Sequence, residues 1–209
     1  MPELAVDIVS DVVCPWCFIG VTRMDQALAA FPEVTPRITF HPFLLDAKTP
    51  EGGVDLREHL RRKYGVDPEP MFARVEAAAK ESGLALDFTK VRRSVPTLRA
   101  HALICRAEER GTQRALKLAL LGAYFLEGRD VSDVEVLAEI ASAHGFTADE
   151  ARGIVTSETE LAETRADAAE IVEQGVSGVP FFVVDKRFAF SGAQPVEKMK
   201  EVIGKALSR

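Results

Sequence analysis

Two cysteines separated by two residues, Cys14 and Cys17, stand where an apolar run passes into a helix-forming run. Thiols at this spacing can close a small disulfide ring. The first turn of a helix offers free backbone N–H groups and the positive end of the helix dipole, and both favour a thiolate over a thiol. Pro15 suits that turn because no N–H partner is lost there. The stretch therefore predicts a strand, a reactive two-cysteine turn and a helix.

The two thiols are expected to have different roles. Cys14 stands at the helix start and is predicted to be the attacking thiol, whereas Cys17, one turn further on, would resolve a mixed disulfide. A zinc site is the alternative, because His101 and Cys105 lie one helical turn apart and could complete a Cys3His set. The chain has no second pair of ligands at close spacing. We therefore expect no metal, and interpret Cys105 as a buried apolar residue.

Composition limits the class of protein. The chain has 209 residues, of which 47% are hydrophobic and 28% charged, as in a soluble globular protein with one large domain or a domain with an insertion. The formal net charge of −6 argues against nucleic acid or an anionic membrane as a partner. Three cysteines cannot form a disulfide framework, and the first residues lack the pattern of a signal peptide. These features predict a cytoplasmic protein.

The periodicity of apolar residues changes twice along the chain. Strands are expected at 4–10 and 37–43 with a helix between them at 18–30, and a second pair of strands at 181–184 and 187–190 precedes a helix at 196–207. Between these blocks the period is helical. The order βαβ…ββα predicts an α/β thioredoxin fold, with residues 1–50 and 175–209 forming the thioredoxin-like domain and residues 51–174 forming a large, all-helical insertion.

Asp7 interrupts the first predicted strand with a carboxylate. Burying a carboxylate in a strand is costly unless the group has a partner or a task. Two interpretations stay open. Asp7 could lie at the wet edge of the strand, or it could be a buried acid near the thiols that moves protons to and from Cys17.

A second informative stretch is Gly175–Phe181, in which Val179 and Pro180 precede a predicted buried strand. A proline within a central strand would remove a ladder hydrogen bond, but a cis peptide bond at the strand entry tolerates it. The backbone of Val179 would then face away from its own sheet. It could pair with an extended substrate chain lying over the cysteines.

At these residues the sequence resembles the DsbA-like branch of the thioredoxin superfamily, and within it the FrnE-type oxidoreductases. The stretches that carry the resemblance are residues 10–20, 63–66, 100–101, 127–130, 175–183 and 191–195. The resemblance implies a thioredoxin fold with an inserted helical domain and thiol–disulfide exchange at Cys14 and Cys17. It also implies a cis peptide bond at Pro180, and an acid near the thiols that corresponds to Asp7.

The same branch includes glutathione-dependent isomerases of the 2-hydroxychromene-2-carboxylate type and kappa-class glutathione transferases. Those relatives usually have a serine where Cys14 stands and lack the second cysteine, so the presence of both thiols favours redox work. Trp16 stands where a histidine often sits in the DsbA pattern. A histidine cation at this position would help to stabilise the thiolate. Because it is absent here, the disulfide is expected to be less strongly oxidising.

The sequence thus predicts a thiol–disulfide oxidoreductase with catalytic residues Cys14, Cys17 and Asp7. Pro15 and Trp16 would shape the rim of the site, and Val179 with Pro180 would dock a thiol- or disulfide-containing protein or small molecule. No metal or organic cofactor is expected, and glutathione is a candidate thiol co-substrate. The alternatives are a glutathione-dependent isomerase or transferase, and a non-catalytic redox sensor or chaperone-like binding module.

Overall fold

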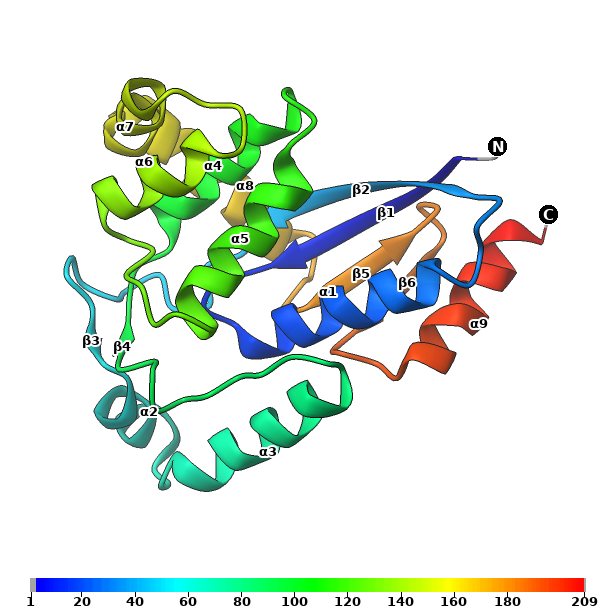
Figure 1. The fold of residues 1–209 in the computed structure, drawn as a ribbon, viewed down its shortest axis with the longest axis horizontal. Helices are drawn as coiled ribbons and strands as arrows, with labels where there is room; N and C mark the ends of the chain where they lie inside the picture. Colours follow the sequence, from blue (N-terminus) through cyan, green and yellow to red (C-terminus); the bar gives the residue numbers. More distant parts are fainter. Residues whose placement is uncertain (1–2, 209) are drawn as a thin grey trace.

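The computed structural model describes residues 3–208; residues 1, 2 and 209, which belong to the predicted thioredoxin-like domain, lie outside the described residues. A four-stranded sheet with the order β2-β1-β5-β6 crosses the middle of the molecule (Figure 1). Its strands are β1 (Glu3–Ser10), β2 (Thr35–Pro42), β5 (Phe181–Val184) and β6 (Phe188–Ser191). β1 runs parallel to β2 and antiparallel to β5, which is antiparallel to β6. The predicted fold class is confirmed.

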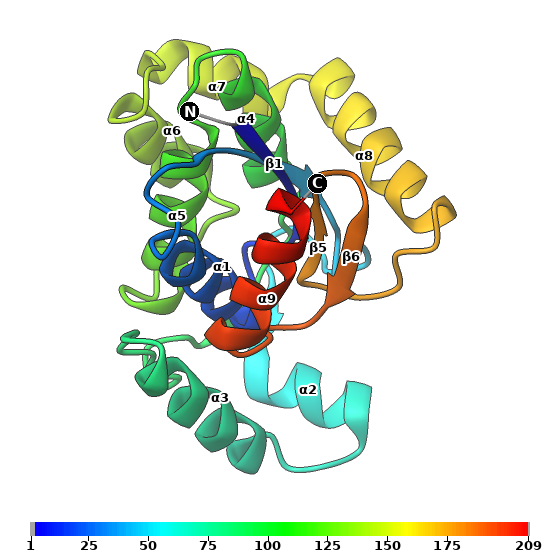
Figure 2. The same ribbon diagram turned by 90° about the vertical axis from the view of Figure 1, so that its right-hand side faces the viewer.

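Side chains alternate between the two faces of β1. Leu4, Val6 and Ile8 are at most 1% exposed and join the main hydrophobic core. Because the side-chain period of a strand is two, Asp7 points to the opposite face. The helices α1 (Pro15–Leu28) and α9 (Val196–Leu207) contact each other and lie on one side of the sheet (Figure 2).

The segment between β2 and β5 is helical except for one small sheet, in which β3 (Val54–Asp55) pairs with β4 (Arg93–Ser94). Its helices are α2 (Leu56–Tyr64), α3 (Glu69–Glu81), α4 (Leu98–Glu108), α5 (Gln113–Phe125), α6 (Val134–Ser142), α7 (Ala148–Thr156) and α8 (Glu158–Glu173). α4, α5 and α8 all contact β2, the edge strand, and α5 also contacts α1. The helical segment therefore packs directly on the sheet.

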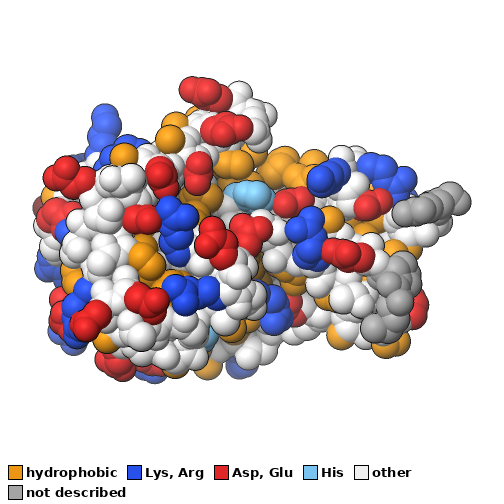
Figure 3. Space-filling model, turned by 90° about the horizontal axis from the view of Figure 1, so that it is seen from above, with side chains coloured by type: hydrophobic (Ala, Val, Ile, Leu, Met, Phe, Trp, Pro, Cys, Tyr) orange, Lys and Arg blue, Asp and Glu red, His pale blue; other side chains and the backbone are white. Residues whose placement is uncertain are grey.

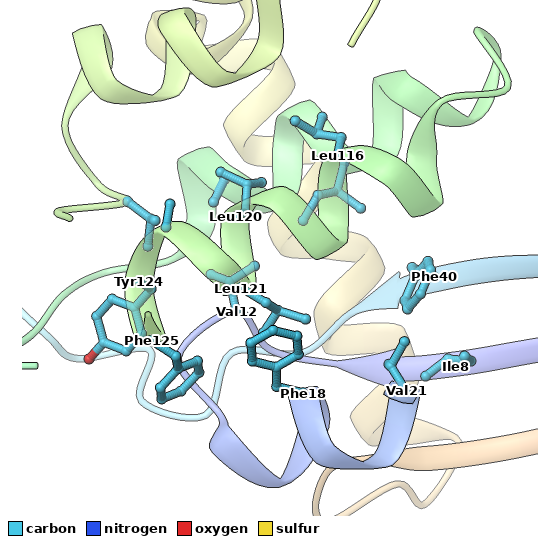
Figure 4. Packing of buried hydrophobic residues seen from close by; sticks show 14 of the residues in the cluster. Ile8, Val12, Phe18, Val21, Phe40, Leu116, Leu120, Leu121, Tyr124 and Phe125 are labelled. Atoms are coloured by element: carbon cyan, nitrogen blue, oxygen red, sulfur yellow. The ribbon is translucent and has the colours of Figure 1, made fainter. Parts of the chain in front are cut away.

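A buried side-chain amide joins α5 to the sheet. Gln113 accepts a hydrogen bond from the Phe40 N–H at 2.8 Å and donates one to the Phe40 carbonyl at 3.0 Å. It thereby satisfies backbone groups on the outer edge of β2, where no further strand pairs. Leu116, Leu120 and Leu121 continue from Gln113 along α5 toward Phe18 and Val12 (Figure 4). One continuous hydrophobic core thus includes residues of α1, α5 and the sheet.

Candidate functional site

The Cys14 thiol lies at the N-terminus of α1. Cys14 is the residue before the first helical turn, and its carbonyl accepts hydrogen bonds from the amides of Cys17 at 3.0 Å and Phe18 at 3.4 Å. Pro15 takes the first helical position, as predicted. The helix is 14 residues long, so the free N–H groups and dipole of its first turn favour negative charge beside Cys14. Cys14 is 4% exposed, which leaves its side chain a narrow opening to solvent.

Cys17 is fully buried one turn further along α1. Burial raises the pKa of its thiol well above the ordinary value of 9.0, and a hydrogen bond with the Cys14 side chain raises it further. Cys17 therefore holds its proton while Cys14 carries the accessible sulfur. This difference agrees with an attacking and a resolving thiol. Both side chains are free thiols in this structure.

The second predicted stretch lies beside the first. The Val179–Pro180 peptide bond is cis, and the Cys14 thiol donates a hydrogen bond to the Val179 carbonyl at 3.7 Å. Gly20 allows this approach, because a Cβ at that position would lie 2.9 Å from Pro180 Cγ. Residues 165 positions apart in the chain therefore form one site.

Trp16, predicted to shape the rim of the site, is half-buried against the core, with the Arg74 guanidinium 6.0 Å from its ring centroid. Pro15 is also half-buried. A small cavity of about 60 Å³ opens next to the thiol stretch, lined by Asp11, Val13 and Tyr64 among others. The cavity lining therefore combines apolar and aromatic side chains with ionisable ones, among them Asp46, His59 and Lys63.

Asp7 is not the buried acid that one interpretation expected. Its side chain is 29% exposed, and one of its oxygens lies 2.9 Å from His41 Nε2. The alternation of β1 turns Asp7 away from Val6 and Ile8, which belong to the core. Asp7 is paired on both sides, with Thr39 and Val183, so its carboxylate reaches water from a face of the sheet and not from the edge of the strand.

The buried acid of this stretch is Asp11, which is fully buried in the turn between β1 and Cys14. Its carboxylate lies 3.2 Å from His101 Nε2 on α4 and accepts the Leu45 N–H at 2.7 Å. Burial alone would raise the pKa of Asp11, but the His101 hydrogen bond, the Leu45 amide and Lys117 together hold it below its ordinary value of 3.8. Burial and the nearby Lys117 lower the pKa of His101, so a neutral imidazole donates to an ionised Asp11.

Lys117 on α5 is the second functional candidate that the sequence interpretation missed. Its side chain is fully buried, and within residues 3–208 its ammonium group has no hydrogen-bond partner. Its Nζ lies 5.9 Å from the centroid of the Phe40 ring. A signal exists in the sequence, because Lys117 shares the apolar face of α5 with Gln113 and Leu121 at helical spacing. A single charge on such a face marks a buried polar site.

The Cys3His zinc alternative is not formed. His101 is engaged by Asp11, and over the described part of the chain no group of three or more His, Cys, Asp or Glu side chains is placed to hold a metal ion. Cys105 is mostly buried on α4, and burial raises the pKa of its thiol to about 11. It therefore remains a protonated thiol at neutral pH.

On the face seen in Figure 3, acidic and basic side chains are interspersed, and neither sign forms a continuous patch. Among residues 3–208, no helix is both long and apolar enough to cross a bilayer.

No curated protein sequence matches this chain. A probable DsbA oxidoreductase from Streptomyces coelicolor is similar in structure, with 35% identity, a TM-score of 0.89 and coverage of 99% of this chain and 91% of the other. The cytosolic disulfide reductase DsbM from Pseudomonas aeruginosa, solved with GSH, shares the fold at 18% identity and a TM-score of 0.69, covering 98% of this chain and all of its own. A 2-hydroxychromene-2-carboxylate isomerase shares it at 14% identity and a TM-score of 0.69, with 96% and 95% covered.

The sequence profile of one family extends over almost the whole chain, from residue 5 to residue 204. Both halves of the thiol site, around Cys14 and around Pro180, fall within that match. Together with the whole-length similarity to the Streptomyces protein, this places the chain in the family described as the DSBA-like thioredoxin domain.

Proposed function

We propose that this chain is a thiol–disulfide oxidoreductase of the FrnE type, in which Cys14 and Cys17 form the redox pair. The observation that carries the proposal is the contact between the Cys14 thiol, at the N-terminus of α1, and the Val179 carbonyl at 3.7 Å. An extended substrate chain that pairs with the Val179 backbone would bring its own sulfur to Cys14.

The exchange proceeds in two displacements. The Cys14 thiolate attacks one sulfur of a substrate disulfide, forms a mixed disulfide and releases the other substrate sulfur as a thiolate. Cys17 then loses its proton and attacks the Cys14 sulfur, which closes the Cys14–Cys17 disulfide and releases the second substrate thiolate. The substrate gains two electrons and the protein loses them. The reverse sequence oxidises a substrate dithiol.

A thiol co-substrate must restore the reduced protein after each reductive turnover. Two glutathione thiols can supply the two electrons and leave as glutathione disulfide. DsbM is described as a cytosolic disulfide reductase and was solved with GSH. We propose glutathione as the recycling thiol and a reducing compartment, the cytoplasm, as the place of action.

The test compares wild type with Cys14→Ser and Cys17→Ser in reduction of a disulfide-bonded peptide by glutathione. Cys14→Ser should lose activity by at least about 1000-fold, because a hydroxyl is not ionised near neutral pH. Cys17→Ser should accumulate a mixed disulfide at Cys14, which mass spectrometry of the intact protein detects. Cys105→Ser serves as the matched control and should retain activity.

Three results would contradict the proposal. Wild-type activity in Cys14→Ser would exclude the mechanism. Turnover of a small aromatic substrate with glutathione that survives Cys17→Ser would instead indicate the glutathione-dependent isomerase or transferase. Stoichiometric, redox-dependent binding of a partner without turnover would indicate a sensor or binding module.

A further inference from the structure

The buried side chain of Lys117 has no role in the two displacements as written above. An ammonium group removed from water is costly unless an anion or several hydrogen-bond acceptors compensate it. Lys117 is fully buried, and its Nζ has no hydrogen-bond partner among residues 3–208. Its Nζ lies 5.9 Å from the centroid of the Phe40 ring, whose face compensates a cation only in part. The position therefore calls for an anion close by.

Asp11 by itself does not fill that need. One of its oxygens lies 3.2 Å from His101 Nε2, and the other accepts the Leu45 N–H at 2.7 Å. The Asp11 carboxylate thus already has partners on α4 and in the loop after β2. Its backbone, in turn, reaches the thiols, because the Asp11 carbonyl accepts the Cys14 N–H at 3.4 Å.

The remaining groups on the packed elements that can become anions are thiols: α5 packs against α1, in which Cys17 is fully buried. The groups that act on Lys117 come from the elements around α5: Cys14 and Cys17 from α1, Asp11 from the turn before it, and Cys105 from α4. Burial lowers the pKa of Lys117, and negative charge on Cys17 has the largest opposing effect. His101, the other titratable group of this cluster, is neutral and bound to Asp11.

The position of α5 is fixed rather than adjustable. Gln113, one turn before Lys117, holds both backbone groups of Phe40. Leu121, one turn after it, is fully buried in the core that includes Phe18. Lys117 is therefore held by packing on both sides, and its charge cannot leave for solvent.

We propose that Lys117 is a positioning residue whose buried ammonium group is the counter-charge for the thiolates of the Cys14–Cys17 pair. The inference rests on the proposed redox function. When glutathione reduces the disulfide, the pair gains two electrons and one proton and becomes one thiolate and one thiol. Lys117 stabilises that thiolate, so it favours the reduced form. It thereby supplies, from a different helix, the cation that Trp16 does not provide within the cysteine motif.

The decisive variant is Lys117→Met, which keeps the length and volume of the side chain and removes the charge. Leu121→Met is the matched control, because it places the same side chain at a buried position of the same helix. In Lys117→Met the thiolate absorbance of the reduced protein at 240 nm should appear at a pH about one unit higher than in wild type. The equilibrium constant with glutathione should shift about tenfold toward the disulfide, a potential about 30 mV lower.

The stability of the Lys117→Met variant is measured alongside. Because the substitution removes an unpaired buried charge, the urea midpoint of Lys117→Met should equal or exceed that of wild type. Lys117→Gln is a second variant with a side chain of similar length. A thiolate titration and a potential equal to those of wild type and Leu121→Met would overturn the inference. A wild-type protein that forms no reversible disulfide with glutathione would instead overturn the proposed function.

A measurement on the unmodified chain is independent of how the variants fold. Because burial lowers the pKa of Lys117, we expect its Nζ signal to titrate at the lowest pH in protein labelled with ¹⁵N-lysine. It should titrate at a higher pH in the reduced protein than in the disulfide form, because only the reduced form presents a thiolate. Identical titration in both forms would overturn the inference.

Discussion

The turn before Cys14 concentrates its polar contacts in one residue. The Asp11 carboxylate is shared between His101 and the Leu45 amide, and its carbonyl accepts the Cys14 N–H. Because Asp11 and His101 are each at most 1% exposed, water cannot replace either partner if the pair is disturbed. The pair thus ties the thiol turn to α4, and protonation of His101 would place a second charge next to the buried Lys117.

This arrangement predicts a pH dependence of stability. The pKa of His101 is lower in the folded chain than its ordinary value of 6.5, so the unfolded chain binds more protons in the interval below 6.5. Stability should therefore fall as pH drops through this interval. In urea denaturation at pH 7.5 and pH 5.5, His101→Gln should lose about 1 kcal/mol less free energy of unfolding than wild type over this range. His144→Gln, a half-buried histidine outside the cluster, should keep the wild-type slope; equal slopes in all three proteins would refute the assignment.

At the scale of elements, α5 and β2 depend on each other. β2 is the edge strand, and the Gln113 side chain pairs with the Phe40 N–H and carbonyl as a neighbouring strand would. Other termini follow local rules that the sequence contains. Asp133 caps α6 through its carboxylate, and Thr147 with Glu150 forms a complete capping box on α7. α6 accordingly begins at Val134, directly after its cap Asp133.

Gln113→Ala should destabilise the chain markedly, since it leaves two buried backbone groups of Phe40 without partners. We expect a loss of about 2–4 kcal/mol in the free energy of unfolding, measured by urea denaturation. Gln174→Ala is the control, because that exposed glutamine bonds only to Glu170 on the surface, and it should change stability by less than about 0.5 kcal/mol. A loss in Gln113→Ala no larger than in the control would show that the amide does not hold α5 to β2.

The molecule as a whole has one main core that extends through both the sheet and the inserted helices. The same cluster includes Ile8 of β1, Phe125 of α5 and Ile203 of α9. A separate, smaller cluster of Val9, Phe43 and Val176 lies near the other face of β1. The sheet and the inserted segment therefore share one core, and the division into residues 1–50 with 175–209 and residues 51–174 stays a prediction.

Continuity of the core predicts cooperative unfolding. Trp16 is the only tryptophan of the chain and reports on the thiol site, whereas circular dichroism at 222 nm reports mainly on the inserted helices. The two urea transitions should coincide within error, because neither part can lose its packing alone. A dichroism transition that precedes the fluorescence transition would show that the inserted segment unfolds independently.

The features of the thiol site that the sequence determined are all local in the chain. The apolar periods, the cysteine spacing and Pro15 specify the strand, turn and helix, and Gly175–Phe181 specifies the opposite wall of the site. The resemblance to DsbA-like proteins identified the cis bond at Pro180. Each of these signals lies within a few residues of the feature that it predicts, so no tertiary information is needed to find it.

The electrostatic environment of the thiols was decided only by the tertiary structure. The sequence interpretation considered only Asp7 as the acid near the thiols, but strand alternation turns Asp7 outward, and packing of α4 over the turn gives Asp11 a buried partner in His101. Lys117 joins the same cluster from about one hundred residues away, because α5 packs on β2 and α1. The burial of a charged side chain and its distance from other charges depend on which faces of the helices and the sheet meet after folding. No local sequence pattern contains that information.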